Sequence, residues 1–390
     1  MTRRHFLKNT ALLGCATLGL PCISSSCFQL FAGGKNGYST RTSALVSQST
    51  VIDMLGMVTL DFPKLYAWQR DPDTFQKSDF DLLKASGINV FHPAVGWDGS
   101  DAYEASLRDI NGWNKLIARQ SGYFLRIDEI ADVERARSEG LIGILIGEQN
   151  SNHFRTVADV DRFYALGQRL SLLAYNANRI GGGSSDARDS GLTDFGLQIV
   201  ERMNQLGMAI DVAHCGDKTT LDTFAASRKP VLVTHANCRA LAPNPRCKTD
   251  EAIRKLAATG GVMGISMIRG FLTPSGTATV ESVLDHIDYV TKLTGVEHVG
   301  IGSDVDLEGR SHFSPEILRA QHIRPGRTTD LDGLNYPKKI FDLTDGLIRR
   351  GYSDHDIALI LGGNFQRALS EIWTVSSPSE VITSSQTASK

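Results

Sequence analysis

Short apolar runs alternate with longer segments of helical periodicity along most of the chain. The eight apolar runs are nearly continuous, as expected for strands that are buried on both faces. They cover residues 51–57, 88–94, 141–147, 170–174, 209–213, 231–234, 262–266 and 299–302. Segments with apolar positions at helical spacing lie between most of them, at residues 78–86, 127–139, 157–168, 193–206, 218–227, 250–259 and 280–294. The alternation predicts a parallel sheet whose strands are connected by helices.

Eight such strands favour a closed α/β barrel. Several predicted helices end in glycine just before the next strand, as expected where a helix leads into a strand. Strands on one right-handed path close into a (β/α)8 TIM barrel more readily than they form an open sheet. An open doubly wound sheet is the alternative. Residues 100–127 and 305–340 are then long insertions over the mouth of the barrel.

The two ends of the chain differ from the predicted barrel, which spans residues 49–376. Residues 1–35 begin with Arg3 and Arg4, followed by an apolar run, and resemble a twin-arginine export signal. This predicts a periplasmic or cell-envelope protein, with Cys22 or Cys27 as a candidate lipid anchor. Residues 36–48 are predicted to be a linker and residues 377–390 a flexible tail, because both are rich in small polar residues.

Composition excludes some classes of partner. The formal net charge of −2 gives no electrostatic footprint for nucleic acid. No internal run reaches the roughly 18 to 20 apolar residues of a membrane span. The predicted mature chain has three cysteines, Cys215, Cys238 and Cys247, so it can form at most one internal disulfide.

Polar side chains follow four of the predicted strands. Glu148, His214, His235 and Asp304 each come directly after an apolar run. Singly, each has an ordinary explanation as a satisfied polar group or a turn residue. Together they would converge at the carboxyl-terminal rim of a barrel, where active sites form. Carboxylates and imidazoles are suitable ligands for zinc or another divalent transition metal.

The sequences around these side chains resemble the membrane (renal-type) dipeptidase family. His214 and His235 lie 21 residues apart, which matches the spacing of the family's metal-binding histidines. The resemblance runs from about Val51 to Trp373. The segments that carry it are Asp211-Val-Ala-His214, residues 190–196, residues 231–241, residues 299–304 and Gly362-Gly-Asn-Phe-Gln-Arg367.

The resemblance implies a metal-dependent hydrolase barrel that cleaves dipeptides with a metal-bound water, and it suggests a homodimer. Glu148 would bridge two zinc ions, and His214 and His235 would hold the second ion. Asp304 would hold the first ion and act on the water. Arg246 would clamp the substrate carboxylate, a task that suits its planar guanidinium; a solvated loop arginine is the alternative.

The chain departs from the family at the first strand. The family has a His-x-Asp metal motif there, whereas this chain has Leu55-Gly56-Met57. Leucine cannot bind a metal, and a thioether is a poor ligand for a zinc–hydroxide centre. We therefore predict one zinc ion, with a second held weakly at most. His92 or Asp61 could refill the lost site, although the strand register does not require it.

Tyr175 stands near the position of a family histidine that polarises the substrate. Its hydroxyl could stabilise an oxyanion, or the ring could serve only for packing. Three functions stay open. They are a mononuclear zinc hydrolase of a dipeptide or related small amide, a barrel that binds a small ligand without catalysis, and a hydrolase of a different amide or ester. The first is favoured, because one zinc ion can activate water.

Overall fold

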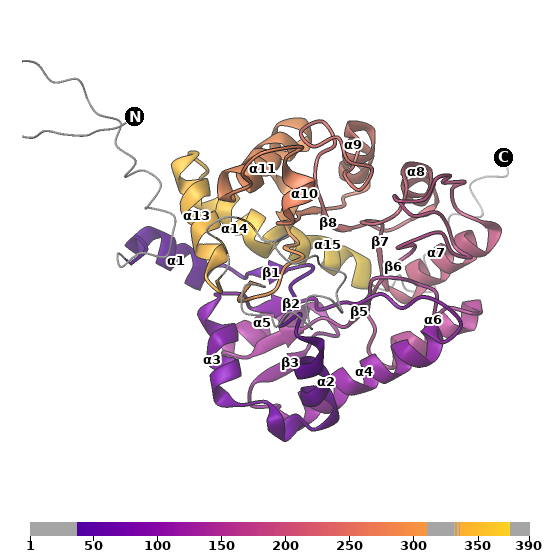
Figure 1. Cartoon of the computed structure of the whole chain (residues 1–390), viewed down its shortest axis with the longest axis horizontal. Coiled ribbons are helices and arrows are strands. Elements are labelled where there is room, and N and C mark those ends of the chain that lie inside the picture. The colour runs from indigo at the N-terminus through magenta and orange to yellow at the C-terminus, as the bar shows by residue number, and fades with distance from the viewer. Residues whose placement is uncertain (1–36, 310–330, 332–333, 335, 375–390) are drawn as a thin grey trace, which may run out of the picture. The chain divides into compact units, whose positions relative to one another are not determined.

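In the part of the chain that the structure describes, ten short parallel strands form the centre, in two sheet segments surrounded by helices (Figure 1). The computed structural model describes residues 37–309, 331, 334 and 336–374, so the predicted export signal and tail lie outside the described residues. The larger segment has the order β3-β4-β2-β1-β10-β9-β8, and the smaller has the order β5-β6-β7. The strands are β1 (Ile52–Asp53), β2 (Val90–Phe91), β3 (Phe124–Arg126), β4 (Ile142–Ile144), β5 (Gly147–Glu148), β6 (Leu170–Leu172), β7 (Ala209–Asp211), β8 (Val233–Ala236), β9 (Met263–Ile265) and β10 (Val299–Ile301).

The two segments close into one barrel. Strands β4 and β5 are two ends of the same extended run, and the parallel bridge between Val95 and Glu148 continues the pairing of β2 with β4. A second parallel bridge joins Asp211 to Leu232 and so connects β7 to the start of β8. The order of strands around the barrel follows the order of the eight apolar runs, which confirms the predicted (β/α)8 fold.

Helices connect the strands where the periodicity predicts them. The predicted ones are α3 (Lys77–Ala85), α5 (Ile130–Ser138), α6 (Val157–Ala165), α7 (Asp194–Leu206), α8 (Asp217–Ala226), α9 (Asp250–Ala258) and α11 (Val280–Thr294). The structure adds α2 (Phe62–Arg70), α10 (Arg269–Leu272), α13 (Lys339–Arg349), α14 (Asp354–Ala358) and α15 (Asn364–Trp373). Gly207 ends α7 in the left-handed conformation, with φ of 77°, as expected for a glycine C-cap.

Two segments differ from the sequence prediction. Residues 100–127 are not simply an insertion over the mouth, because they contain α4 (Ala102–Arg119) and strand β3, which pairs with β4. The apolar face of α4 includes Ile110, Trp113 and Leu116, whose helical spacing is masked by the polar residues between them. The segment predicted as a linker holds α1 (Thr40–Gln48).

Helix α1 is stabilised by contacts with the C-terminal helices. Its own sequence has only two buried apolar residues, so the local pattern does not predict a helix. It lies beside α13 in Figure 1. Ser39 caps it by accepting a hydrogen bond from the backbone N–H of Thr42 at 3.0 Å. Thr42 in turn donates its hydroxyl to Asp345 of α13 at 3.1 Å.

An apolar core fills the amino-terminal end of the barrel. Side chains from the first residues of the strands pack against Phe365 and its neighbours on α15. At Gly300 a Cβ atom would lie only 2.5 Å from the Phe365 ring, so β10 needs glycine at this contact. This end is therefore occupied by packing, and the carboxyl-terminal end is left for polar groups.

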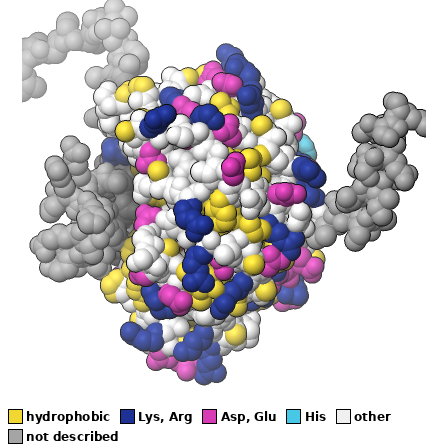
Figure 2. All heavy atoms as spheres, turned by 90° about the vertical axis from the view of Figure 1, so that its right-hand side faces the viewer, with side chains coloured by type: hydrophobic (Ala, Val, Ile, Leu, Met, Phe, Trp, Pro, Cys, Tyr) yellow, Lys and Arg dark blue, Asp and Glu magenta, His cyan; other side chains and the backbone are white. Residues whose placement is uncertain are grey.

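Figure 2 shows one face of the molecule, on which basic and acidic side chains are interspersed. This distribution agrees with the low net charge and gives no single-sign field for a polyanion on that face. Within the described ranges, no helix combines the length and hydrophobicity that are needed to cross a membrane.

Candidate metal centre

Two histidines face one another at the carboxyl-terminal rim. His235 lies in β8, and His214 lies three residues after β7. Their Nε2 atoms are 3.0 Å apart, and their ring centroids are 5.0 Å apart. Two imidazole nitrogens bound to one tetrahedral zinc ion would be separated by about 3.3 Å, given typical Zn–N distances. The pair is thus close to the spacing that one shared ion requires.

Both histidines are in the neutral form that a metal binds. Burial is the main cause that lowers the pKa of each imidazole well below its ordinary range. The positive charges of Arg246 and Lys248 lower these pKa values further. At neutral pH both rings are therefore uncharged. A metal ion does not have to compete with the extra proton of an imidazolium.

Thr234 contacts His235, and Asp211 contacts Thr234; the sequence analysis assigned neither residue a role in the site. Thr234 Oγ1 lies 2.8 Å from His235 Nδ1, and Asp211 accepts the Thr234 hydroxyl at 2.6 Å. Asp211 is an acidic residue inside an otherwise apolar strand, and it is buried. That interruption of the apolar run was the available signal.

Tyr175 lies beside His214 at the carboxyl-terminal rim. Its ring stacks on His214, with centroids 3.8 Å apart and planes inclined by 23°. Burial and the negative charge of Asp304 raise the pKa of its hydroxyl. The hydroxyl is therefore protonated at neutral pH and can donate a hydrogen bond.

Arg246 is buried rather than solvated. Its guanidinium donates to the backbone carbonyls of Ala213 and His235, the latter at 3.0 Å, so it ties the two histidine-bearing segments together. Burial lowers its pKa, while the negative charges of Asp304 and Asp211 raise it. The predicted clamp on a substrate carboxylate would have to use donors that these carbonyls leave available.

Asp304 lies on the same rim in an unusual backbone conformation. Its φ is 59°, and its N–H donates to Leu55 O at 2.9 Å. Its charge raises the pKa values of Tyr175 and Arg246, which places the carboxylate within electrostatic reach of both.

Glu148 is buried, but the structure does not bring it to the histidine pair as a preformed ligand. Both carboxylate oxygens lack a hydrogen-bond partner among the described residues. Burial and the charge of Asp109 on α4 raise its pKa well above the ordinary range. No three His, Cys, Asp or Glu side chains of the described ranges are grouped to hold one metal ion. The predicted Glu148–His214–His235 set is thus only partly assembled.

The half of the rim that departs from the family is apolar. Leu55 and Met57 are buried in a cluster with Leu60 and Ala94. The structure gives the candidate replacements other roles. Asp61 caps α2 by accepting from Lys64 N at 3.1 Å, and His92 Nδ1 contacts Leu145 O at 2.9 Å. Among the described residues, neither belongs to a group of three side chains that could hold a metal.

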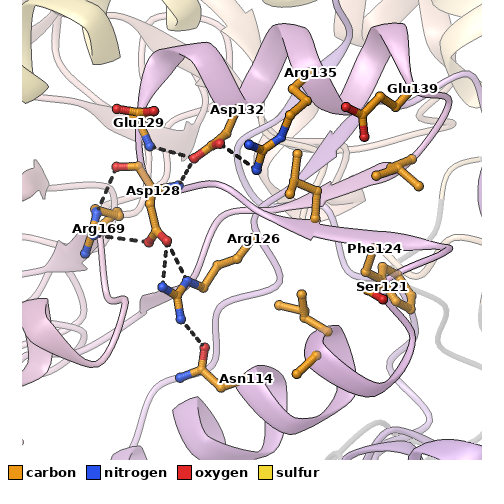
Figure 3. Close-up of a pocket in the computed structure, with 14 residues that line it drawn as sticks. Asn114, Ser121, Phe124, Arg126, Asp128, Glu129, Asp132, Arg135, Glu139 and Arg169 are labelled. Carbon is orange, nitrogen blue, oxygen red and sulfur yellow. Dashed lines mark hydrogen bonds and ion pairs between the residues drawn. The ribbon is translucent and has the colours of Figure 1, made fainter.

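A hollow of about 1020 Å³ lies between α4, β3 and α5, away from the histidine pair (Figure 3). Its central charges are paired with one another. Asp128 contacts both Arg126 and Arg169, and Asp132 contacts Arg135. These pairs hold the loop after β3 in place, so the histidine pair remains the better candidate for chemistry.

A parallel barrel with paired imidazoles at the carboxyl ends of its strands defines the class of amidohydrolase-like barrels. The comparisons with known proteins narrow this class. Residues 39–316 match the model of the membrane dipeptidase family, peptidase family M19. The chain belongs to this metallopeptidase family and is a hydrolytic enzyme whose family implies a metal cofactor.

Individual relatives agree with the family model. Dipeptidase verJ of Clonostachys rogersoniana is 30% identical over 280 residues, which are 71% of this chain and 67% of that protein. Dipeptidase 3 of Rattus norvegicus is 29% identical over 315 residues, covering 77% of this chain and 60% of that protein. An amidohydrolase from Pseudomonas aeruginosa superposes with a TM-score of 0.74 at 27% identity, covering 85% of this chain and 99% of that one.

Proposed function

We propose that the protein is a mononuclear zinc hydrolase of a dipeptide or a related small amide. The observation that carries this proposal is the neutral His214–His235 pair, with Nε2 atoms 3.0 Å apart, on the rim of a dipeptidase-family barrel. A zinc ion bound there supplies a Lewis acid and a water of lowered pKa. The neutral imidazoles suit zinc, and Glu148 remains the predicted third ligand.

The surrounding side chains supply the other functions of a hydrolase. Asp304 would take a proton from the attacking water, which is general base catalysis. Tyr175 would donate its hydroxyl to the oxygen of the scissile amide as negative charge develops there. Arg246 would attract the free carboxylate of a dipeptide, because its guanidinium is a cation within electrostatic reach of both Asp304 and Tyr175.

The buried carboxylate of Glu148 supports a cation in this region. An ionised carboxylate without hydrogen-bond partners is costly inside a protein, and a nearby cation offsets that cost. The apolar cluster around Leu55 and Met57 supports one ion rather than two, since neither side chain offers a suitable zinc ligand.

That same cluster favours the second candidate function, a barrel that binds a small ligand without catalysis. Apolar side chains fill and dry the half of the rim where the family's first metal would be held. Hydrolysis of a different amide or an ester is the third candidate. The proposal includes export by the twin-arginine route, a periplasmic or lipid-anchored location, and a homodimer.

The test is turnover of a panel of dipeptides, acylated amino acids and small esters by the purified protein. We expect dipeptide hydrolysis that a chelator abolishes and added zinc restores. His214→Ala should lower kcat/KM by at least about 100-fold, because it removes a metal ligand. His355→Ala, which changes an exposed histidine on α14, is the matched control. Ligand binding without turnover would support the second candidate, and turnover of esters alone would support the third.

A further inference from the structure

We propose that Asp211 and Thr234 are positioning residues that fix the ring tautomer of His235, so that its Nε2 lone pair faces His214. The inference rests on the proposed function, because it gives the pair a role in metal binding. Both residues are buried, and they lie on the neighbouring strands β7 and β8.

The carboxylate of Asp211 is held by three donors. Oδ1 accepts the backbone N–H groups of Ala213 and Thr234, each at 2.9 Å. Oδ2 accepts the Thr234 hydroxyl at 2.6 Å, a length typical of an O–H donor on an ionised carboxylate. The carboxylate is the acceptor in each of these three bonds, as expected for an ionised group.

Burial raises the pKa of Asp211 and its three hydrogen bonds lower it; with the carboxylate ionised, the hydrogens along this chain give the tautomer. The Thr234 hydroxyl has one hydrogen, which it gives to Asp211. Its oxygen can then only accept from His235 Nδ1, which lies 2.8 Å away. A neutral imidazole has a single N–H, so Nε2 of His235 carries a lone pair. That lone pair accepts from His214 Nε2, which lies 3.0 Å away and is the donor of this pair in the metal-free protein.

This arrangement matters because only the nitrogen without hydrogen can bind a metal. The hydrogen bond made by one ring nitrogen decides which tautomer is present at the other. In the Asp211–Thr234–His235 chain, the carboxylate acts on the metal ligand through a hydroxyl rather than directly.

The decisive variant is Asp211→Asn. The side-chain oxygen can keep both backbone N–H bonds, while the new NH2 group donates to Thr234 Oγ1. The threonine hydrogen must then turn to His235 Nδ1, and the imidazole proton moves to Nε2. We expect nitrogen-15 NMR of histidine-labelled, chelator-treated protein to show His235 protonated at Nδ1 in the wild type and at Nε2 in the variant. His235→Gln identifies the signal.

Zinc affinity gives the second readout. We expect Asp211→Asn and Thr234→Val to weaken zinc binding by about 10- to 100-fold, and Thr234→Ser to retain both the tautomer and the affinity. Asp189→Asn is a matched control, because Asp189 also accepts a threonine hydroxyl at 2.6 Å and two backbone N–H groups, but without a histidine beyond it. It should change neither readout.

The outcomes separate this inference from the proposed function. A wild-type His235 protonated at Nε2, or an Asp211→Asn variant that keeps Nδ1–H and full affinity, would overturn the positioning role even if zinc binds and turnover occurs. The expected tautomers without any zinc binding would leave the positioning role intact and count against the proposed function alone. If Asp211→Asn does not fold, Thr234→Val and Thr234→Ser decide the question.

Discussion

At the residue scale, the backbone conformation of Asp304 costs stability at a position where the proposed chemistry needs a carboxylate. Asp304 is the one residue other than glycine with positive φ in the described ranges. Such a conformation costs on the order of 1–3 kcal/mol and persists only where the surroundings enforce it. The bond from its N–H to Leu55 O supplies part of that enforcement. Aspartate tolerates the left-handed region better than most residues, which suits a carboxylate that must stand on this rim.

His92 makes a testable prediction about pH. Burial lowers its pKa from 6.5 to about 4 in the folded protein. Below pH 6.5 the unfolded chain binds a proton that the folded protein does not, so stability falls as the pH drops toward 4. The shift corresponds to about 3 kcal/mol. We expect urea denaturation to show this loss between pH 6.5 and 4.

The matched variant is His92→Asn, whose amide can still donate to Leu145 O but does not titrate in this range. It should be less stable at neutral pH and show a flatter dependence on pH. A wild-type slope that the substitution leaves unchanged would assign the acid sensitivity to other groups.

The sequence located individual site residues unevenly. His214, His235 and Asp304 could be found because each interrupts an apolar strand at its carboxyl end. The surroundings of Glu148 could not, since they depend on Asp109 of α4, a helix that the sequence pattern did not reveal. The burial of Arg246 was not predicted either, because it depends on the carbonyls of Ala213 and His235, which belong to two different segments of the chain.

At the scale of elements, the proposed function makes the first strand the element that limits the rim to one metal ion. Leu55 and Met57 turn the carboxyl end of this strand into an apolar cluster with Leu60 and Ala94. The strand itself keeps its place, since Asp53 pairs with β2 and β10. The strand thus holds its place in the barrel with a packed apolar pair at its end, where the resemblance to the family implies a His-x-Asp motif.

The double variant Leu55→His/Met57→Asp tests this view. It places two polar side chains in an apolar cluster, so we expect a loss of roughly 2–5 kcal/mol in the free energy of unfolding in the presence of chelator. Excess zinc should restore part of that stability, since a ligand that binds only the folded state stabilises it. Urea denaturation with and without zinc measures both effects.

Leu55→Ile/Met57→Leu is the control, because it keeps the cluster apolar and should cost less than about 1.5 kcal/mol. If, in chelator, the polar double variant lost no more unfolding free energy than the apolar control, this half of the rim would be open to solvent rather than packed.

The elements themselves were predicted well where they follow local patterns. The strands and most connecting helices appear where the periodicity puts them, although the strands are shorter. Helices α1 and α4 were missed for different reasons. Helix α1 depends on capping by Ser39 and contacts with Asp345 far along the chain, and α4 has an apolar face interrupted by polar residues.

At the scale of the whole molecule, the barrel separates stability from function. Phe365 and its neighbours close the amino-terminal end with apolar packing, while His214, His235, Tyr175 and Asp304 gather at the other end. This division explains why the barrel could be predicted from apolar runs alone. The surroundings of Glu148 and Arg246 could not be, because they depend on how separate segments of the chain meet at one rim.

The central claim is that this rim holds a single zinc ion between His214 and His235. The most direct measurement is metal analysis of the protein purified without chelator and after dialysis against limiting zinc. The account predicts about one zinc ion per chain, and its loss in His214→Ala and His235→Ala but not in His355→Ala. Two tightly bound ions per chain, or none that depends on these two histidines, would contradict it.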